Sequence, residues 1–167
     1  MGRARDAPGY TDFAVNETSD IRHLAGNKRA RREYHILETV EAGVALTGTE
    51  VKSARSGQIQ LKDSHVQFRG GEAFLVGAHI SPYEAGSREN HPPERDRKLL
   101  LKRREIDRLF SRATLKGLTI VPLSVYMKGN LVKIELALAQ GKKLHDKRQA
   151  EKQKILDREA QEAVDRH

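Results

Sequence analysis

The sequence contains no cysteine and no tryptophan, and only 5% of its 167 residues are aromatic. Without cysteine, disulfides and cysteine-ligated zinc are excluded, and a reducing compartment fits best. No segment approaches the roughly 20 apolar residues of a membrane-spanning helix, and the first 20 residues lack the apolar stretch of a signal peptide. These absences predict a soluble cytoplasmic protein with a core of Val, Leu and Ile.

Sequence patterns typical of catalysis are also missing. There is no phosphate-binding loop, no dinucleotide fingerprint and no histidine pair with metal-ligand spacing on a helix. The residue types of a catalytic triad occur together at Asp63 to His65, but adjacent residues of a strand point to opposite faces and cannot meet. His79 and His91 are best interpreted as polar loop residues. We therefore predict no enzymatic activity, no metal and no cofactor; a small nuclease would need a site that the sequence does not offer.

Positive charge is in excess, with 31 Lys and Arg against 23 Asp and Glu, a net charge of +8 and a pI of about 9.8. Three basic clusters contribute: "NKRARRE" at 27–33, the stretch 88–105, and the C-terminal segment. One such cluster often marks only a solvated surface. Three within one small domain favour a nucleic acid whose phosphates are contacted from several sides. An anionic membrane surface is the rival partner.

The chain divides by composition into three parts. Residues 1–26 are polar and interrupted by Gly and Pro, which predicts a disordered leader. Residues 27–140 carry the apolar runs of a domain, and residues 141–167 form a basic tail. The elements expected in the domain are a strand from Tyr34 broken at Gly43, a helical turn capped by Thr49, a hairpin at Gly70-Gly71, a helix over 98–117 and a second hairpin around 128–130.

About six short strands and one good helix indicate a mainly β fold. Open sheet edges in a small protein favour aggregation, and closure into a barrel removes them. We therefore predict a small closed antiparallel barrel of the OB type with flanking helices, a class that commonly binds nucleic acid. Pro122 lies inside an expected strand, so that position is an edge or a bulge.

Two residues within the domain have open interpretations. Leu100 either lies among arginines on a helix surface, where it could cover a nucleobase, or belongs to an extended segment before the helix. Glu41 would be repelled by phosphate, yet a carboxylate accepts hydrogen bonds from base amino and imino groups and so discriminates bases. An ordinary exposed strand glutamate is the alternative for Glu41.

The tail consists mainly of helix-forming residues with a thin apolar stripe at Ile155, Leu156 and Val164. Lone helices are marginal without packing, so we expect the tail to be disordered when free and helical on a partner. Its basic start, "GKKLHDKR", favours RNA as that partner. A solubilising extension is the alternative.

Many segments in a fixed order resemble the SsrA-binding protein family, which escorts transfer-messenger RNA to stalled bacterial ribosomes. They include "NKRARREY", "EAGVALTGTEVKSAR", "FLVGAHISPYEAGSRENHPPERDRKLLL", "GLTIVPLSVY", "VKIELALAQGKK" and "HDKR". The resemblance implies an OB-like barrel that binds the tRNA-like domain of that RNA. It also implies a tail that is helical on the ribosome and enters the decoding centre and the empty mRNA channel, lined by small-subunit rRNA.

The resemblance further implies a non-catalytic, cytoplasmic adaptor that acts as a monomer, without cofactor or membrane. A general OB-type RNA-binding or translation factor is the alternative. The residues implied to contact transfer-messenger RNA are Asn27, Lys28, Arg29, Tyr34, Glu41, Lys52, Arg55, His91, Arg97, Lys98, Leu100 and Lys133. Those implied to act at the decoding centre are Gly141, Lys142, Lys143, His145, Asp146, Lys147 and Arg148.

Overall fold

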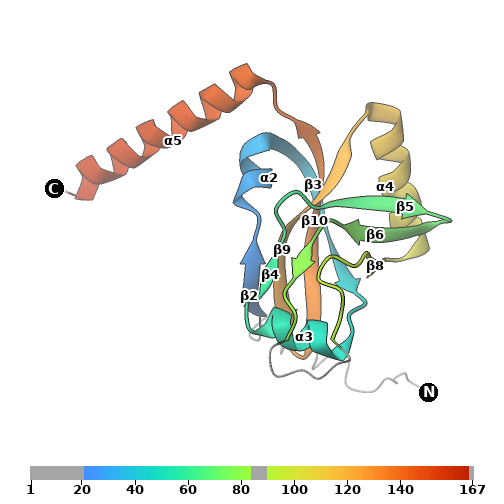
Figure 1. The fold of residues 1–167 in the computed structure, drawn as a ribbon. Helices are drawn as coiled ribbons and strands as arrows, with labels where there is room; N and C mark the ends of the chain where they lie inside the picture. Colours follow the sequence, from blue (N-terminus) through green and yellow to red (C-terminus); the bar gives the residue numbers. More distant parts are fainter. Residues whose placement is uncertain (1–20, 84–89, 166–167) are drawn as a thin grey trace, which may run out of the picture.

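The computed structural model describes residues 21–83 and 90–165 (Figure 1). The strands are β2 (Ile21–Gly26), β3 (Tyr34–Val44), β4 (Ile59–Gln60), β5 (His65–Arg69), β6 (Glu72–Val76), β7 (His79–Ile80), β8 (Arg97–Leu100), β9 (Thr119–Lys128) and β10 (Leu131–Gly141). The helices are α2 (Lys28–Glu33), α3 (Gly48–Arg55), α4 (Arg103–Lys116) and α5 (Leu144–Asp165). No helix in the described ranges is long and apolar enough to cross a membrane.

The main sheet has seven strands in the order β2-β9-β10-β3-β8-β6-β5, and β4 pairs with β7 in a separate two-stranded sheet. Each described pairing is antiparallel. The mainly β prediction is confirmed, but the predicted closed barrel is wrong, because the sheet ends at β2 and β5 without a pairing between them. Apolar side chains of distant strands, such as Val66 and Ile120, share one core instead. Packing rather than a continuous hydrogen-bond ladder therefore holds the two ends of the sheet together.

Strand β10 shows most directly how the sequence determines the sheet. Val132, Ile134, Leu136 and Leu138 alternate along it and are buried, as their period of two predicts. The register between β10 and β9 shifts after Glu135, opposite the stretch that contains Pro122. Strand β2 pairs with β9 only from Ser124 to Lys128, so at Pro122 β10 is the one described strand that pairs with β9. Pro122 therefore lies beside a bulge and on a side of β9 that has no strand partner there, as both predicted alternatives for this position allow.

Strand β3 runs through Gly43 without a break, in contrast to the predicted interruption. It is paired with β10 and β8 at that residue, so both neighbours support the backbone that Gly leaves without a side chain. The predicted leader also ends earlier than expected. Residues 21–26 form β2 and pair with β9, while residues 1–20 lie outside the described part of the chain.

Two helices differ in detail from their predicted limits. Thr47, and not Thr49, caps α3, where its hydroxyl and the Glu50 carboxylate form a capping box. Helix α4 begins at Arg103, because residues 97–100 pair as β8 between β3 and β6; Leu99 is buried in that strand. The predicted stop at Gly117 is confirmed, since this residue adopts a left-handed conformation with a φ of 62°.

The tail forms the 22-residue helix α5, which projects away from the sheet (Figure 1). None of its described side chains is buried. The prediction that it becomes helical only on a partner differs from the structure, where the helix is present in the chain alone. High intrinsic propensity and hydrogen bonds one turn apart, from Gln153 to Asp157 and from Gln161 to Asp165, support it.

Candidate nucleic-acid interface

Neighbouring strands in the middle of the sheet present one row of side chains on the face opposite the main core. Lys133 on β10 lies opposite Tyr126 on β9 and Gly43 on β3, and Gly43 lies opposite Leu100 on β8. Partners in antiparallel pairs project from the same face. Glu41 precedes Gly43 by two residues and therefore shares this face. The register thus brings together Glu41, Leu100 and Lys133, which are far apart in the sequence.

Leu100 is 53% exposed, so its side chain is available on the surface. Both it and Leu101 lie before α4, which confirms the extended alternative for this segment. A Cβ at residue 43 would lie 3.3 Å from Leu100 Cβ, so Leu100 covers the glycine closely. A hollow of about 270 Å³ beside it is lined by Leu100, Leu131 and Lys133 among others. Apolar walls with a cation at the rim suit a ribose or nucleobase and its phosphate.

The Glu41 carboxylate has two donors from β9. Tyr126 donates its hydroxyl to Oε2, and Lys128 Nζ lies 3.3 Å from each carboxylate oxygen. Burial alone would raise the pKa of Glu41, but these hydrogen bonds and the nearby Lys133 outweigh it and lower the pKa. The carboxylate is therefore ionised at neutral pH. We call the surface formed by Glu41, Leu100, Tyr126, Lys128 and Lys133 the sheet surface.

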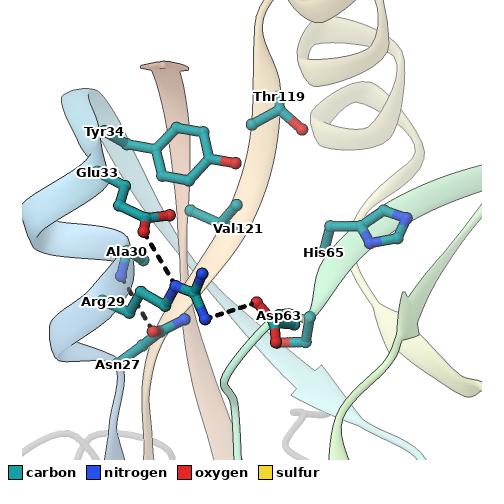
Figure 2. Close-up of a pocket in the computed structure, with 10 residues that line it drawn as sticks. Asn27, Arg29, Ala30, Glu33, Tyr34, Asp63, His65, Thr119 and Val121 are labelled. Carbon is teal, nitrogen blue, oxygen red and sulfur yellow. Dashed lines mark hydrogen bonds and ion pairs between the residues drawn. The ribbon is translucent and has the colours of Figure 1, made fainter. Parts of the chain in front are cut away.

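Helix α2 and the segment before β5 enclose a second region, a hollow of about 260 Å³ (Figure 2). Arg29 bridges its two walls, with Nε 2.9 Å from Glu33 and a terminal nitrogen 3.3 Å from Asp63. Tyr34 and His65 line this hollow from opposite sides, and in Figure 2 the His65 ring points away from Tyr34. The hydrogen bond from Arg29 lowers the pKa of Glu33. Two acidic partners offset the charge of Arg29, so this hollow is a weaker anion site than the basic sequence predicts.

The tail begins beside this second hollow. Gly141, the last residue of β10, pairs with Tyr34, and the Lys142 N–H donates to the Glu33 carbonyl at 2.8 Å. Lys147 is close enough to Glu33 to contribute to lowering its pKa. These contacts fix the point where α5 leaves the sheet. The backbone of residues 144–146 belongs to α5, while the side chains of His145 and Asp146 lie outside the described part of the structure.

Three residues that the resemblance implied as RNA contacts are buried in the chain alone, and partners within the protein occupy their side chains. Arg97 is 0% exposed and donates to Glu50, to the Ala78 carbonyl and to the Pro93 carbonyl. A buried cation needs such partners, and here the protein supplies them.

The other two buried residues are polar and are likewise satisfied internally. His91 is hydrogen-bonded at both ring nitrogens, to Thr49 Oγ1 and to the Ile80 carbonyl, each at 2.9 Å. Asn27 caps α2 by accepting from the Ala30 N–H and donates to the Pro122 carbonyl at 2.9 Å. Both residues therefore stabilise loops and helix ends.

The remaining implied cations are exposed but are not on one patch. Lys28 begins α2, and Lys98 on β8 pairs with Glu72 at 2.5 Å. Lys52 and Arg55 are exposed on α3, where Lys52 Nζ lies 5.6 Å from the centre of the Tyr83 ring. Tail residues Lys143 and Arg148 are exposed as well.

Replacing Asn27 with alanine is expected to lower the free energy of unfolding by about 2 kcal/mol. The substitution removes the α2 cap and leaves the buried Pro122 carbonyl without this donor. Urea denaturation of wild type and variant measures the change. Lys28→Ala, at the next and exposed position, is the control and should change stability by less than about 0.5 kcal/mol. Equal stability of both variants would contradict a structural role for Asn27.

Sequence reasoning missed Tyr126 and Lys128, which supply the donors to Glu41. A signal was present: a hairpin around residues 128–130 places Tyr126 and Lys128 on the face of Lys133. The helical state of residues 28–33 was also missed. Six residues are too few for a periodic pattern, although Asn27 is a favourable N-cap residue.

Comparisons with known proteins agree with one another. The family model described as SmpB protein matches residues 24–166. An SsrA-binding protein of Gloeothece citriformis is 52% identical over 152 residues, covering 90% of this chain and 98% of the relative. One of Carboxydothermus hydrogenoformans is 53% identical over 141 residues, covering 84% of this chain and 95% of the relative.

A solved structure described as "tmRNA-SmpB: a journey to the center of the bacterial ribosome" has a similar fold. Its TM-score is 0.63 and its sequence identity 47%, with 75% of this chain and 92% of that chain covered. The match between family model and chain covers the sheet from Leu24 of β2 onward, the sheet surface and the tail helix. This chain belongs to the SmpB family of SsrA-binding proteins.

Proposed function

We propose that this protein is an RNA-binding adaptor that binds the tRNA-like domain of transfer-messenger RNA and delivers it to the A site of stalled ribosomes. Membership of the SmpB family supports this function, as does the similarity to a tmRNA-SmpB structure. The observation that carries it is the sheet surface, to which four strands contribute. It combines the Glu41 carboxylate as a hydrogen-bond acceptor, the apolar Leu100, and the cations of β9 and β10. The adaptor acts in the cytoplasm, as a monomer and without chemistry of its own.

The sheet surface suits unpaired nucleotides better than a plain duplex. Leu100 and Leu131 are exposed beside a hollow, and apolar surface of this kind covers a base or ribose. Lys133 at the rim can hold a phosphate, while the Glu41 carboxylate accepts from a base amino or imino group. RNA loops display such groups, and the loops of a tRNA-like domain provide them.

The tail has a separate partner in this proposal. Helix α5 leaves the sheet at Gly141 and has no buried side chain of its own among those described. Its first turns carry Lys147 and Arg148, with Lys142 and Lys143 just before, a cationic segment suited to ribosomal RNA phosphates. In this proposal the two predicted units bind different RNAs. Residues 27–140 bind transfer-messenger RNA, and residues 141–167 bind ribosomal RNA at the decoding centre.

Substitution of Glu41 by glutamine or of Leu100 by serine is expected to weaken binding of a tRNA-like-domain RNA by about 10- to 100-fold. This range corresponds to about 1–3 kcal/mol for a base contact or a stacked base. Both residues are exposed, so the fold should be retained. Filter binding at one stated salt concentration measures the affinities.

Lys116→Met at the C-terminal end of α4 removes an exposed cation away from the sheet surface and is the control. Its affinity should stay within about twofold of wild type. Competition with an unrelated duplex of equal length separates the proposal from the alternative of general RNA binding. Undiminished binding supports selective recognition of the tRNA-like domain, and displacement by the duplex supports the general factor.

A further inference from the structure

Glu41 lies directly opposite a second acidic residue in the sheet. The register of β3 and β10 pairs it with Glu135. Like charges directly opposite each other destabilise a sheet, so this pair is unfavourable for folding. Each carboxylate has its own cationic partner: Arg31 on α2 lies 3.6 Å from Glu135, and Lys128 contacts Glu41. Local rules of sheet pairing are most often broken where a function requires it.

The donors to Glu41 come from a strand that is not its neighbour. Strand β10 lies between β9 and β3, so Tyr126 and Lys128 reach across β10 to one carboxylate. Neighbouring strands are roughly 4.8 Å apart, so the two side chains span about twice that distance. The donors occupy part of the carboxylate, which has about four acceptor positions. Glu41 remains 37% exposed, and acceptor capacity is left toward solvent.

An acceptor that is already oriented and ionised binds a base edge with less loss of side-chain entropy. Tyr126 restricts the Glu41 side chain, and Lys128 and Lys133 keep it charged. Exposed ion pairs on a protein surface contribute little to folding. A gain in folding stability therefore does not explain why Tyr126 and Lys128 both contact the exposed Glu41 carboxylate next to Glu135.

We propose that Tyr126 and Lys128 are positioning residues that orient the Glu41 carboxylate to accept hydrogen bonds from the edge of an unpaired nucleobase. The inference rests on the proposed function, since it names how part of the same RNA site is built. It adds two residues that touch no RNA in this account and act through Glu41. The class of ligand is a base that presents amino or imino donors, as cytosine and guanine do.

A double-mutant cycle tests this coupling. Tyr126→Phe keeps the ring and removes only the donor, and we expect it to weaken binding of the tRNA-like-domain RNA by about tenfold. In a Glu41→Gln background the same change should have less than a twofold effect, because the group that Tyr126 orients is already altered. Lys128→Met should behave in the same way, and Lys116→Met is the matched lysine control. Thermal unfolding of each variant checks that the fold is kept.

The dependence of RNA affinity on pH gives a readout that a structural role would not change. Glu41 must be ionised to accept, and its pKa is lowered in the wild type, so affinity should fall only at acidic pH. Tyr126→Phe removes a donor to the ionised form, so the fall should begin at a higher pH. Lys133, Glu135 and Arg31 also face this site and are unchanged in both proteins. His23 lies opposite Tyr126 on β2, so both proteins carry His23→Gln in this experiment.

Three outcomes are distinguishable. Non-additive effects together with an upward shift of the acidic limb support the positioning role. Equal losses from Tyr126→Phe in the wild-type and Glu41→Gln backgrounds, or an unshifted limb, overturn it while leaving the proposed function intact. If the wild-type protein does not prefer the tRNA-like domain over an unrelated duplex, the proposed function fails first, and the positioning role for this RNA fails with it.

Discussion

Replacing Arg97 with methionine is expected to lower the free energy of unfolding by about 3–5 kcal/mol, because it breaks a buried ion pair from one side. Arg97 and Glu50 are both 0% exposed, with 2.7 Å between a terminal guanidinium nitrogen and the carboxylate. The change also leaves the Ala78 and Pro93 carbonyls without their donor. Urea denaturation followed by circular dichroism at neutral pH measures the loss.

The same carboxylate provides the control. Arg95 also contacts Glu50, but its side chain is 34% exposed, so Arg95→Met should cost only about 1 kcal/mol. Burial would raise the pKa of Glu50, yet hydrogen bonds from Arg95, the Thr47 backbone and Arg97 together lower it. A lowered pKa contributes stability that is lost as pH falls, so the difference between Arg97→Met and wild type should shrink in acid. Equal losses from both arginine variants at neutral pH would contradict this account.

Removing residues 141–167 is expected to abolish ribosome rescue while changing the affinity for the tRNA-like-domain RNA by less than about threefold. The segment contains eight Lys or Arg and six Asp or Glu, so only +2 of the net charge of +8 is lost. No described side chain of α5 is buried, so the sheet should remain folded. Filter binding measures affinity, and a reconstituted tagging reaction on stalled ribosomes measures rescue.

A full-length variant with Lys147→Gln and Arg148→Gln is the companion to this truncation. It retains α5 and removes two cations of its first turns, so rescue should fall without loss of RNA binding. If instead the truncated chain loses most of its affinity for the tRNA-like domain, the tail is an arm of the same RNA site. The assignment of two RNA partners to two parts of the chain would then have to be withdrawn.

Patterns that repeat within one element could be predicted from sequence. The alternation of Val132, Ile134 and Leu136 specified β10 and its buried face. Gly117 specified the end of α4, because a left-handed residue there is favourable for glycine. Elements stabilised by remote partners could not be predicted in this way. Strand β8 has four residues in a basic segment and exists because β3 and β6 pair with it from either side.

The candidate site shows the same division. The face of Lys133 followed from the local pattern of its strand. Exposure of Leu100 was expected from the helical interpretation, whereas in the structure it results from the position of Leu100 in strand β8. Burial of Arg97 did not, because its partner Glu50 lies 47 positions away and the surrounding sequence is that of a charged loop. A resemblance indicates which residues matter to a family. It does not distinguish a residue that contacts RNA from one that holds the contacting strand in place.

The close approach of Leu100 to Gly43 has a consequence for natural variation at this position. A methyl group at residue 43 would meet Leu100 at 3.3 Å and would have to displace it outward, away from β3. The main hydrophobic core lies on the other face of the sheet, so its packing would change little. A substitution of Gly43 would therefore change the shape of the sheet surface around Leu100, while expression and solubility stayed normal. Such a variant would fold normally and still bind its partner less well.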